Sequence, residues 1–271
     1  MRLEKNSGNR RHDRIYLLIF IVILIVSSFG CAGVNRLREA HDAFNQAAAT
    51  ENAQRFDANP AVSAASLVTV RSGYASALLS ISKIDANDEK SLRADGLWGT
   101  ALTLKALCEW RLGKFDQALD IANKEAGNST AGQIFPRDRA LLAALPGLIM
   151  ADQAYDKILN KKPLQEVVDL LTGPSGAIIK IQSARDFVDK DHPVQVYLIQ
   201  AQLAAYRNYR VAQRQLAGIE TIPVDNPNRK KAADQLMELK QLLKDNNPAP
   251  AGQSLILYWA ALIGMSPPKW D

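Results

Sequence analysis

Cysteine and histidine are scarce in this chain of 271 residues, which contains two cysteines and three histidines. An exported domain held together by disulfide bonds would show a larger, even set of cysteines, so stability must come from the apolar core. Cys108 lies in an apolar helical pattern, which favours a small buried hydrophobic residue over a nucleophile. Metal sites need several ligands, and His12, His41 and His192 have no metal-ligand spacing. We therefore expect no metal centre.

Motifs for catalysis or cofactor binding are also missing. Residues 173–176 (Gly-Pro-Ser-Gly) lack the following lysine and the preceding strand of a phosphate-binding loop. The chain has no Gly-x-Ser-x-Gly nucleophile elbow and no His-Glu-x-x-His zinc motif. Helical exported enzymes that cleave cell-wall glycan carry a catalytic Glu followed by Ser, and this chain has no Glu-Ser dipeptide. The sequence therefore predicts a protein that is not an enzyme and binds no cofactor.

A strong charge imbalance is missing from most of the chain. The formal net charge is +5, but the first 30 residues contribute five basic and two acidic side chains. Residues 31–271 therefore carry 28 basic and 26 acidic residues, a net charge of +2. Nucleic-acid-binding domains usually show a pronounced basic patch or stripe, so we expect no nucleic-acid partner.

One long apolar run is present, and it lies near the N-terminus. Residues 15–26 are continuously apolar, five basic residues precede them, and small residues lead into Cys31. Positive charge before an apolar segment keeps that end in the cytoplasm during insertion. The run is short for a membrane-spanning helix, which needs about 20 residues. The pattern favours an export signal.

This segment resembles the signal peptide of a bacterial lipoprotein, with Gly30 directly before the cysteine. The resemblance implies cleavage after residue 30, fatty acyl chains on Cys31, and export of the remaining chain. Ala32 follows the cysteine where an aspartate would retain the protein at the inner membrane, which implies the outer membrane, facing the periplasm. A retained anchor from Ile15 to about Val34 is the competing interpretation, and it also exports the rest of the chain.

Residues 31–265 read as helix almost throughout. Apolar residues recur at spacings of three and four, prolines stand at expected helix starts, and glycines stand at expected ends. Pro146 and Gly147 are expected to kink or split their helix. The pattern predicts no strand, and it predicts helices over residues 34–56, 61–83, 88–112, 114–126, 137–160, 163–190 with a break near Gly173, 193–217, 227–244 and 252–264.

Residues 97–126 resemble a tetratricopeptide repeat. The matching positions are Ala106, Trp110, Gly113, Phe115 and Ala118. The small residues would let two antiparallel helices approach closely, and the glycine would permit a tight turn between them. The resemblance implies an all-α stack of helical hairpins over residues 31–265, with residues 266–271 as a tail. An irregular α-helical bundle is the alternative.

The candidate binding residues are aromatic or cationic. Arg207, Arg210 and Arg214 share one helical face, which could bind an acidic partner or form a solvated surface. Trp110 and Arg111 end the first helix of the repeat-like segment, and that side often lines the inner groove in the tetratricopeptide family. Trp and Arg dominate many binding interfaces, although a tryptophan at the position of Trp110 is more often a core residue than a groove residue.

These observations predict a membrane-anchored lipoprotein of the cell envelope that acts as a non-catalytic protein-binding scaffold or adaptor. Its expected contacts are the membrane, through the lipid on Cys31, and an envelope protein. The alternative is a periplasmic component that binds a small ligand and is associated with a transporter, which predicts a closed apolar pocket within the helical stack.

Overall fold

A computed structural model describes residues 32–54, 60–127, 134–246 and 249–270. The elements of these residues are helices, as predicted, and no strand occurs among them. The segment resembling a signal peptide and Cys31 lie outside the described residues. The helices are α1 (Ala32–Gln54), α2 (Pro60–Ser82), α3 (Ala86–Ala94), α4 (Trp98–Arg111), α5 (Phe115–Gly127), α6 (Pro136–Leu159), α7 (Leu164–Thr172), α8 (Ala177–Ala184), the 3-10 helix η2 (Arg185–Phe187), α9 (Val194–Ala217), α10 (Pro227–Asn246) and α11 (Ala249–Ile263).

The predicted helix boundaries differ from the structure mainly at internal breaks. The helix expected over residues 88–112 is two helices, α3 and α4, because Gly96 adopts a positive φ of 71° that an α-helix cannot contain. Pro146 does not split α6, which continues through it to Leu159. A proline removes one hydrogen-bond donor from a helix. Residues of α6 before and after Pro146 are buried, and their packing keeps the helix continuous.

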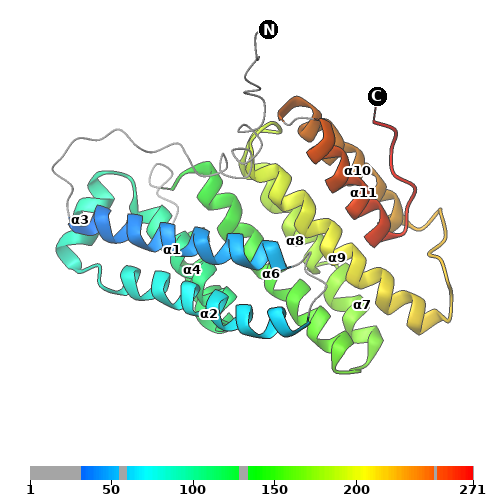
Figure 1. Cartoon of the computed structure of the whole chain (residues 1–271), viewed down its shortest axis with the longest axis horizontal. Coiled ribbons are helices and arrows are strands. Elements are labelled where there is room, and N and C mark those ends of the chain that lie inside the picture. Colours follow the sequence, from blue (N-terminus) through cyan, green and yellow to red (C-terminus); the bar gives the residue numbers. More distant parts are fainter. Residues whose placement is uncertain (1–31, 55–59, 128–133, 247–248, 271) are drawn as a thin grey trace, which may run out of the picture.

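Most helices that follow one another in the chain pack side by side, except that α3 packs on α1 and α4 and not on α2 (Figure 1). The helices α1 and α2 form an antiparallel pair at one end of the molecule, and α10 and α11 lie at the opposite end. Between them, α6 packs on α4, α5, α7 and α8, while α9 packs on α6, α7 and α8 and carries α10 and α11 on its other side. The described part of the chain contains no helix long and apolar enough to cross a bilayer.

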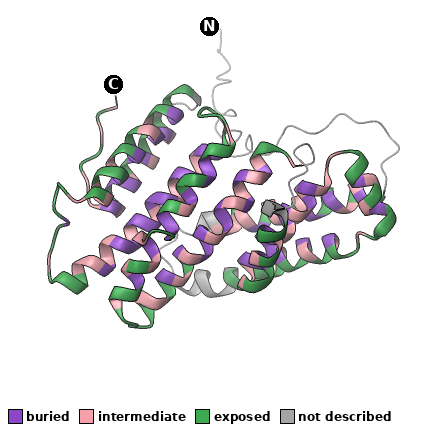
Figure 2. Ribbon diagram, turned by 180° about the vertical axis from the view of Figure 1, so that it is seen from behind, coloured by how far each residue is buried: buried purple, intermediate pink, exposed green. Residues whose placement is uncertain are grey.

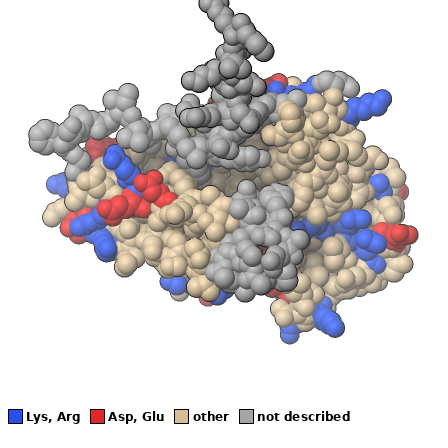
Figure 3. Space-filling view, in the orientation of Figure 1, with Lys and Arg blue, Asp and Glu red and all other residues tan. Residues whose placement is uncertain are grey.

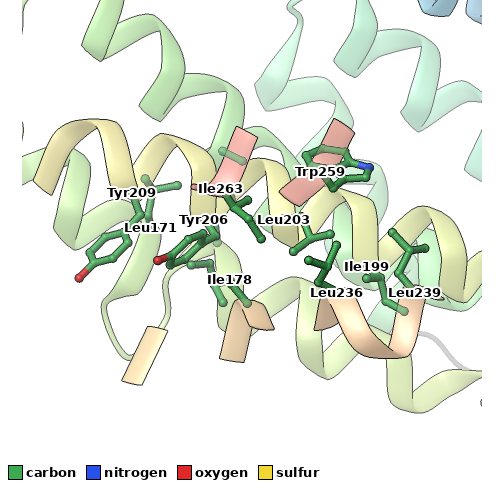
Figure 4. Packing of buried hydrophobic residues seen from close by; sticks show 14 of the residues in the cluster. Leu171, Ile178, Ile199, Leu203, Tyr206, Tyr209, Leu236, Leu239, Trp259 and Ile263 are labelled. Atoms are coloured by element: carbon green, nitrogen blue, oxygen red, sulfur yellow. The ribbon is translucent and has the colours of Figure 1, made fainter. Parts of the chain in front are cut away.

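Burial follows the helical periodicity, so each helix turns one stripe of residues inward (Figure 2). The largest cluster surrounds α9, whose Ile199, Leu203 and Tyr206 meet Leu239 of α10 and Trp259 of α11 (Figure 4). Fully burying one such side chain contributes about 1.5–3 kcal/mol. Because α9 packs on α6, α7, α8, α10 and α11, it is the central helix of this half of the core.

The segment that resembles a tetratricopeptide repeat forms a helical hairpin of α4 and α5. Ala106 and Ala118 are completely buried, and Gly113 makes the turn at a φ of 79°. Their small side chains allow the two helices to pack closely, as expected for this pattern. Phe115 is half-buried and packs on the same cluster as Trp110.

A buried polar network that the sequence pattern did not predict crosses the centre of the molecule. The guanidinium of Arg185, in η2, donates to Gln195 Oε1 at 2.7 Å and to Gln202 Oε1 at 3.2 Å, both on α9. It also forms an ion pair with Glu238 of α10. Gln202 in turn donates to Gln182 of α8 at 2.7 Å. The network therefore fixes the relative positions of η2, α8, α9 and α10 with bonds that demand specific geometry.

Candidate partner-binding surface

Trp110 lies in the core, at the point where α4 meets α6. It is 5% exposed, and its indole N–H donates to Asp152 Oδ2 on α6 at 2.8 Å. The Arg111 guanidinium covers the ring at 4.1 Å from the ring centroid. The indole is therefore held by packing, by a hydrogen bond and by a cation–π contact, and its face is not available to a partner while Arg111 covers it.

Arg111 links this tryptophan to the first helical pair. It forms an ion pair with Glu51 of α1 at 3.3 Å, and Tyr74 of α2 donates its hydroxyl to the same carboxylate at 2.5 Å. Burial raises the pKa of the Tyr74 hydroxyl well above its ordinary value of 10.0, so Tyr74 remains a hydrogen-bond donor. The side chain of Arg111 keeps 19% of its surface exposed. Arg111 is therefore a structural bridge whose edge reaches the surface.

Arg207 reaches α6 from α9. Its guanidinium lies 5.3 Å from the centroid of the Tyr155 ring and donates to Asn208 Oδ1 at 2.9 Å. Asn208 is buried and donates to the carbonyl of Ala151 at 3.1 Å, which fixes α9 against α6 at this level. Within the described residues Arg207 has no ion pair with a carboxylate, so its charge is not neutralised by a direct partner.

These two groups meet on one face of α6. Asp152 contacts Trp110 and Tyr155 contacts Arg207, and positions three apart lie on the same side of a helix. Leu159, one turn further on, continues this side and is 60% exposed. We define the α6 strip as Arg111, Asp152, Tyr155, Leu159 and Arg207. It combines cations, a carboxylate and exposed apolar surface, and it joins two candidates that lie about 100 residues apart in the sequence.

The other two arginines of the predicted stripe do not join the strip. Arg210 donates to the carbonyl of Leu262 at 3.1 Å, and a Cβ built on Gly264 would lie 2.4 Å from its Cζ atom. Arg210 therefore covers the C-terminal end of α11, where carbonyl groups need donors. Arg214 is half-buried, and its Nε has no hydrogen-bond partner among the described residues. The three arginines therefore have three different environments: Arg207 lies beside Tyr155, Arg210 covers the end of α11, and Arg214 is half-buried.

The C-terminal tail packs back on the molecule. Trp270 is half-buried and joins the cluster around α9. A Cβ on Gly252 would lie 2.8 Å from the Cη2 atom of this tryptophan, so the absence of a side chain in α11 makes room for the ring. The tryptophan is therefore part of the fold at this end.

The titratable groups elsewhere serve as parts of the fold. Burial raises the pKa of the Cys108 thiol to about 12, so little of the reactive thiolate exists at neutral pH. His192 Nδ1 accepts the backbone N–H of Val194 at 3.2 Å, which supports the start of α9. Asp138 is buried on α6 and accepts from the Thr100 hydroxyl at 2.6 Å. Among the described residues no group of three or more His, Cys, Asp or Glu side chains could hold a metal ion.

A hollow of about 380 Å³ lies beside the end of the α6 strip. Its lining residues are Asp156, Lys157, Asn160 and Lys162, and it is open to solvent. Polar, charged walls and a wide mouth do not match the closed apolar pocket that the ligand-binding alternative expects. The charged side chains on the face seen in Figure 3 gather in groups of mixed sign, separated by wide uncharged areas.

No protein-family model, no curated protein and no solved structure matches this chain. The candidate surface therefore depends on the geometry described above.

Proposed function

We propose that this chain is a membrane-anchored lipoprotein of the cell envelope that acts as a non-catalytic protein-binding scaffold. In this proposal Cys31 carries the lipid, the leader before it is removed, and the α6 strip binds a segment of another envelope protein. The outer membrane, facing the periplasm, is the proposed site, because Ala32 follows the cysteine. A tetratricopeptide-like stacking of the helical hairpins is part of the same proposal.

The α6 strip is the observation that carries the binding role. Tyr155 is a large aromatic side chain that is 44% exposed although Arg207 is stacked beside it. Tyr and Arg are two of the residue types that are enriched among the few side chains that dominate binding energy at protein interfaces. The flanking Asp152 and Arg111 are fixed by Trp110 and Glu51, so little side-chain freedom would be lost when a partner binds.

Site-specific photo-crosslinking in intact cells tests this proposal. A benzoyl-phenylalanine placed at Tyr155 should capture a discrete envelope protein. The matched control is Phe187, which is also 44% exposed and also lies beside an arginine, Arg139, at 5.7 Å. Capture at position 155 that disappears with Arg207→Ala supports the strip. Equal capture at both positions, or none at position 155, would contradict it.

Mass spectrometry of the N-terminus tests the anchor separately. The proposal expects a mature chain that begins at Cys31 and carries acyl chains. An intact Met1 leader would end the lipoprotein interpretation, while the crosslinking result would still decide the binding role.

A further inference from the structure

The outer side of α2 carries large exposed apolar residues and very little charge. Val68 is 70% exposed and Leu79 is 58% exposed, and Leu67 lies beside the first of them. The other exposed positions between them are small and mostly carry a hydroxyl group (Thr69, Ser72, Ala75 and Ser76), and Arg71 is the single charged residue of the whole helix. A surface helix normally turns several charged residues outward, so α2 lacks the usual charged side.

The neighbouring helix shows the contrast. Exposed positions of α1 include Arg38, Glu39 and Asp42, so this helix has an ordinary charged outer side. In Figure 3 charged side chains of both signs gather at the left, over α1 and α3. The surface below them, where Figure 1 draws the second half of α2, is mostly uncharged. The scarcity of charge therefore belongs to α2 and is not general to this end of the molecule.

The surroundings of this side of α2 depend on its distance from the proposed anchor at Cys31. The helix α1 begins at Ala32, directly after Cys31, so no flexible linker separates the described body from the attachment point. Gly33 is buried against Asp88 of α3, and Val34 packs in the core cluster of α1, α2 and α4. The first turn of α1 therefore cannot serve as a spacer without breaking these contacts.

The C-terminal end of α2 lies at this attachment point. The guanidinium of Arg36, in the second turn of α1, donates to the carbonyl of Lys83 and forms an ion pair with Asp88. Lys83 directly follows α2, so Leu79 lies about one turn of helix away from this junction. The exposed cation Arg71 lies among these residues and Lys83 follows the end of the helix, and no acidic residue occurs in α2 to repel anionic lipid.

We propose that the outer face of α2 lies on the phospholipid surface as a second membrane contact beside the N-terminal anchor. This inference rests on the membrane anchoring in the proposed function. Val68 and Leu79, which share one side of the helix, would enter the boundary between headgroups and acyl chains, about 17 Å apart along the helix, with Leu67 at the edge of this side. The two cations would lie among the anionic headgroups. The body would then be held in one orientation on the membrane.

Fluorescence quenching by spin-labelled lipids tests the orientation. Val68→Cys, Leu79→Cys and Leu257→Cys would each be labelled with an environment-sensitive dye in the full lipidated chain. Leu257 is a matched control because it is 48% exposed and lies on α11, at the opposite end of the molecule. Cys108 is buried and should contribute little background. The vesicles would contain phosphatidylethanolamine and phosphatidylglycerol, with nitroxide lipids as the quencher.

We expect quenching at positions 68 and 79 to exceed that at position 257 by about twofold or more, as shallow insertion requires. Adding Val68→Glu to the Leu79→Cys protein should reduce the quenching at position 79, while flotation with the vesicles continues. Adding Leu257→Glu instead should not.

Two outcomes would overturn the inference without affecting the anchor. Equal quenching at all three positions in protein that floats with the vesicles would show that α2 does not face the lipid. A blue-shifted dye at position 79 without lipid quenching, together with crosslinks between copies, would show that a second copy covers the face. Protein that fails to float and lacks acyl chains by mass spectrometry would refute the anchor, and this inference with it.

Discussion

Replacing Arg185 with methionine should destabilise the protein far more than the loss of one surface charge. The change removes the donors to the side-chain oxygens of Gln195 and Gln202, which are 3% and 0% exposed. An orphaned buried acceptor costs about 1–3 kcal/mol, so two cost about 2–5 kcal/mol once partial relaxation is allowed. The Glu238 side chain is 38% exposed and can rehydrate, so it adds little.

Urea unfolding of the full chain in mild detergent, followed by far-UV circular dichroism, measures this loss. With a typical slope of about 2 kcal/mol per molar urea, the midpoint should fall by about 1–2.5 M. Arg93→Met is the matched control, because Arg93 pairs with Glu89 at 2.7 Å on an exposed helix surface. That pair should contribute about 0–1 kcal/mol.

The origin of the effect can be separated from simple loss of packing. Combining Arg185→Met with Gln195→Leu and Gln202→Leu removes the orphaned acceptors together with their donor. The two leucines also remove the amide donors to Gln182 Oε1 and to the backbone carbonyls of Arg185 and Ile178, so the triple variant should recover only part of the loss. The reasoning would be refuted if Arg185→Met cost no more than Arg93→Met.

Three further changes have expected outcomes. Cys108 should react with iodoacetamide at pH 8 only on the timescale of unfolding, because burial raises its pKa to about 12; rapid labelling of folded protein by mass spectrometry would contradict this. Gly264→Ala should lower the thermal midpoint by the equivalent of about 1–2 kcal/mol, because φ is +67° and the new Cβ would displace Arg210; Arg210→Ala in the same protein should reduce the penalty. Burial, and then Arg137, lower the pKa of His41 from 6.5, so protonation favours the unfolded state. The stability from His41 is therefore complete above about pH 6.5 and declines below it, and His41→Gln should flatten this part of the pH profile in urea titrations.

The all-helical fold could be predicted because its signals are local. Apolar spacing, prolines at helix starts and glycines at turns lie within a few residues of the feature that they determine. The hairpin of α4 and α5 was predicted for this reason, since Ala106, Gly113 and Ala118 act within one hairpin. The break at Gly96 was missed because a single glycine in a helical pattern does not reveal the sign of its φ angle.

The candidate surface could be predicted only in part, because its partners are distant in sequence. The stripe of three arginines was visible as a spacing, but nothing near Arg210 in the sequence indicates that Leu262 is its acceptor. The pairing of Trp110 with Asp152 and of Arg207 with Tyr155 depends on how α4 and α9 pack on α6. The Arg185 network was also missed, because its partners are distant in sequence. In addition, an arginine next to an aspartate, as at positions 185 and 186, is ordinarily expected on the surface.

The length of α1 connects the two proposed contacts. Glu51, which pairs with Arg111 of the α6 strip, lies 19 residues after Ala32, or about 30 Å along the helix. The strip therefore begins at the end of α1 that is far from the anchor, while α2, antiparallel to α1, carries its exposed apolar residues back toward the anchor. If α2 lies on the lipid, α1 must run roughly parallel to the bilayer, and Arg111 stays within a few nanometres of the surface. A partner with its own membrane anchor would then meet the strip at a high effective concentration, so even a weak contact would suffice. It follows that variants of the outer face of α2 should weaken crosslinking at Tyr155 to such a partner without changing any residue of the strip.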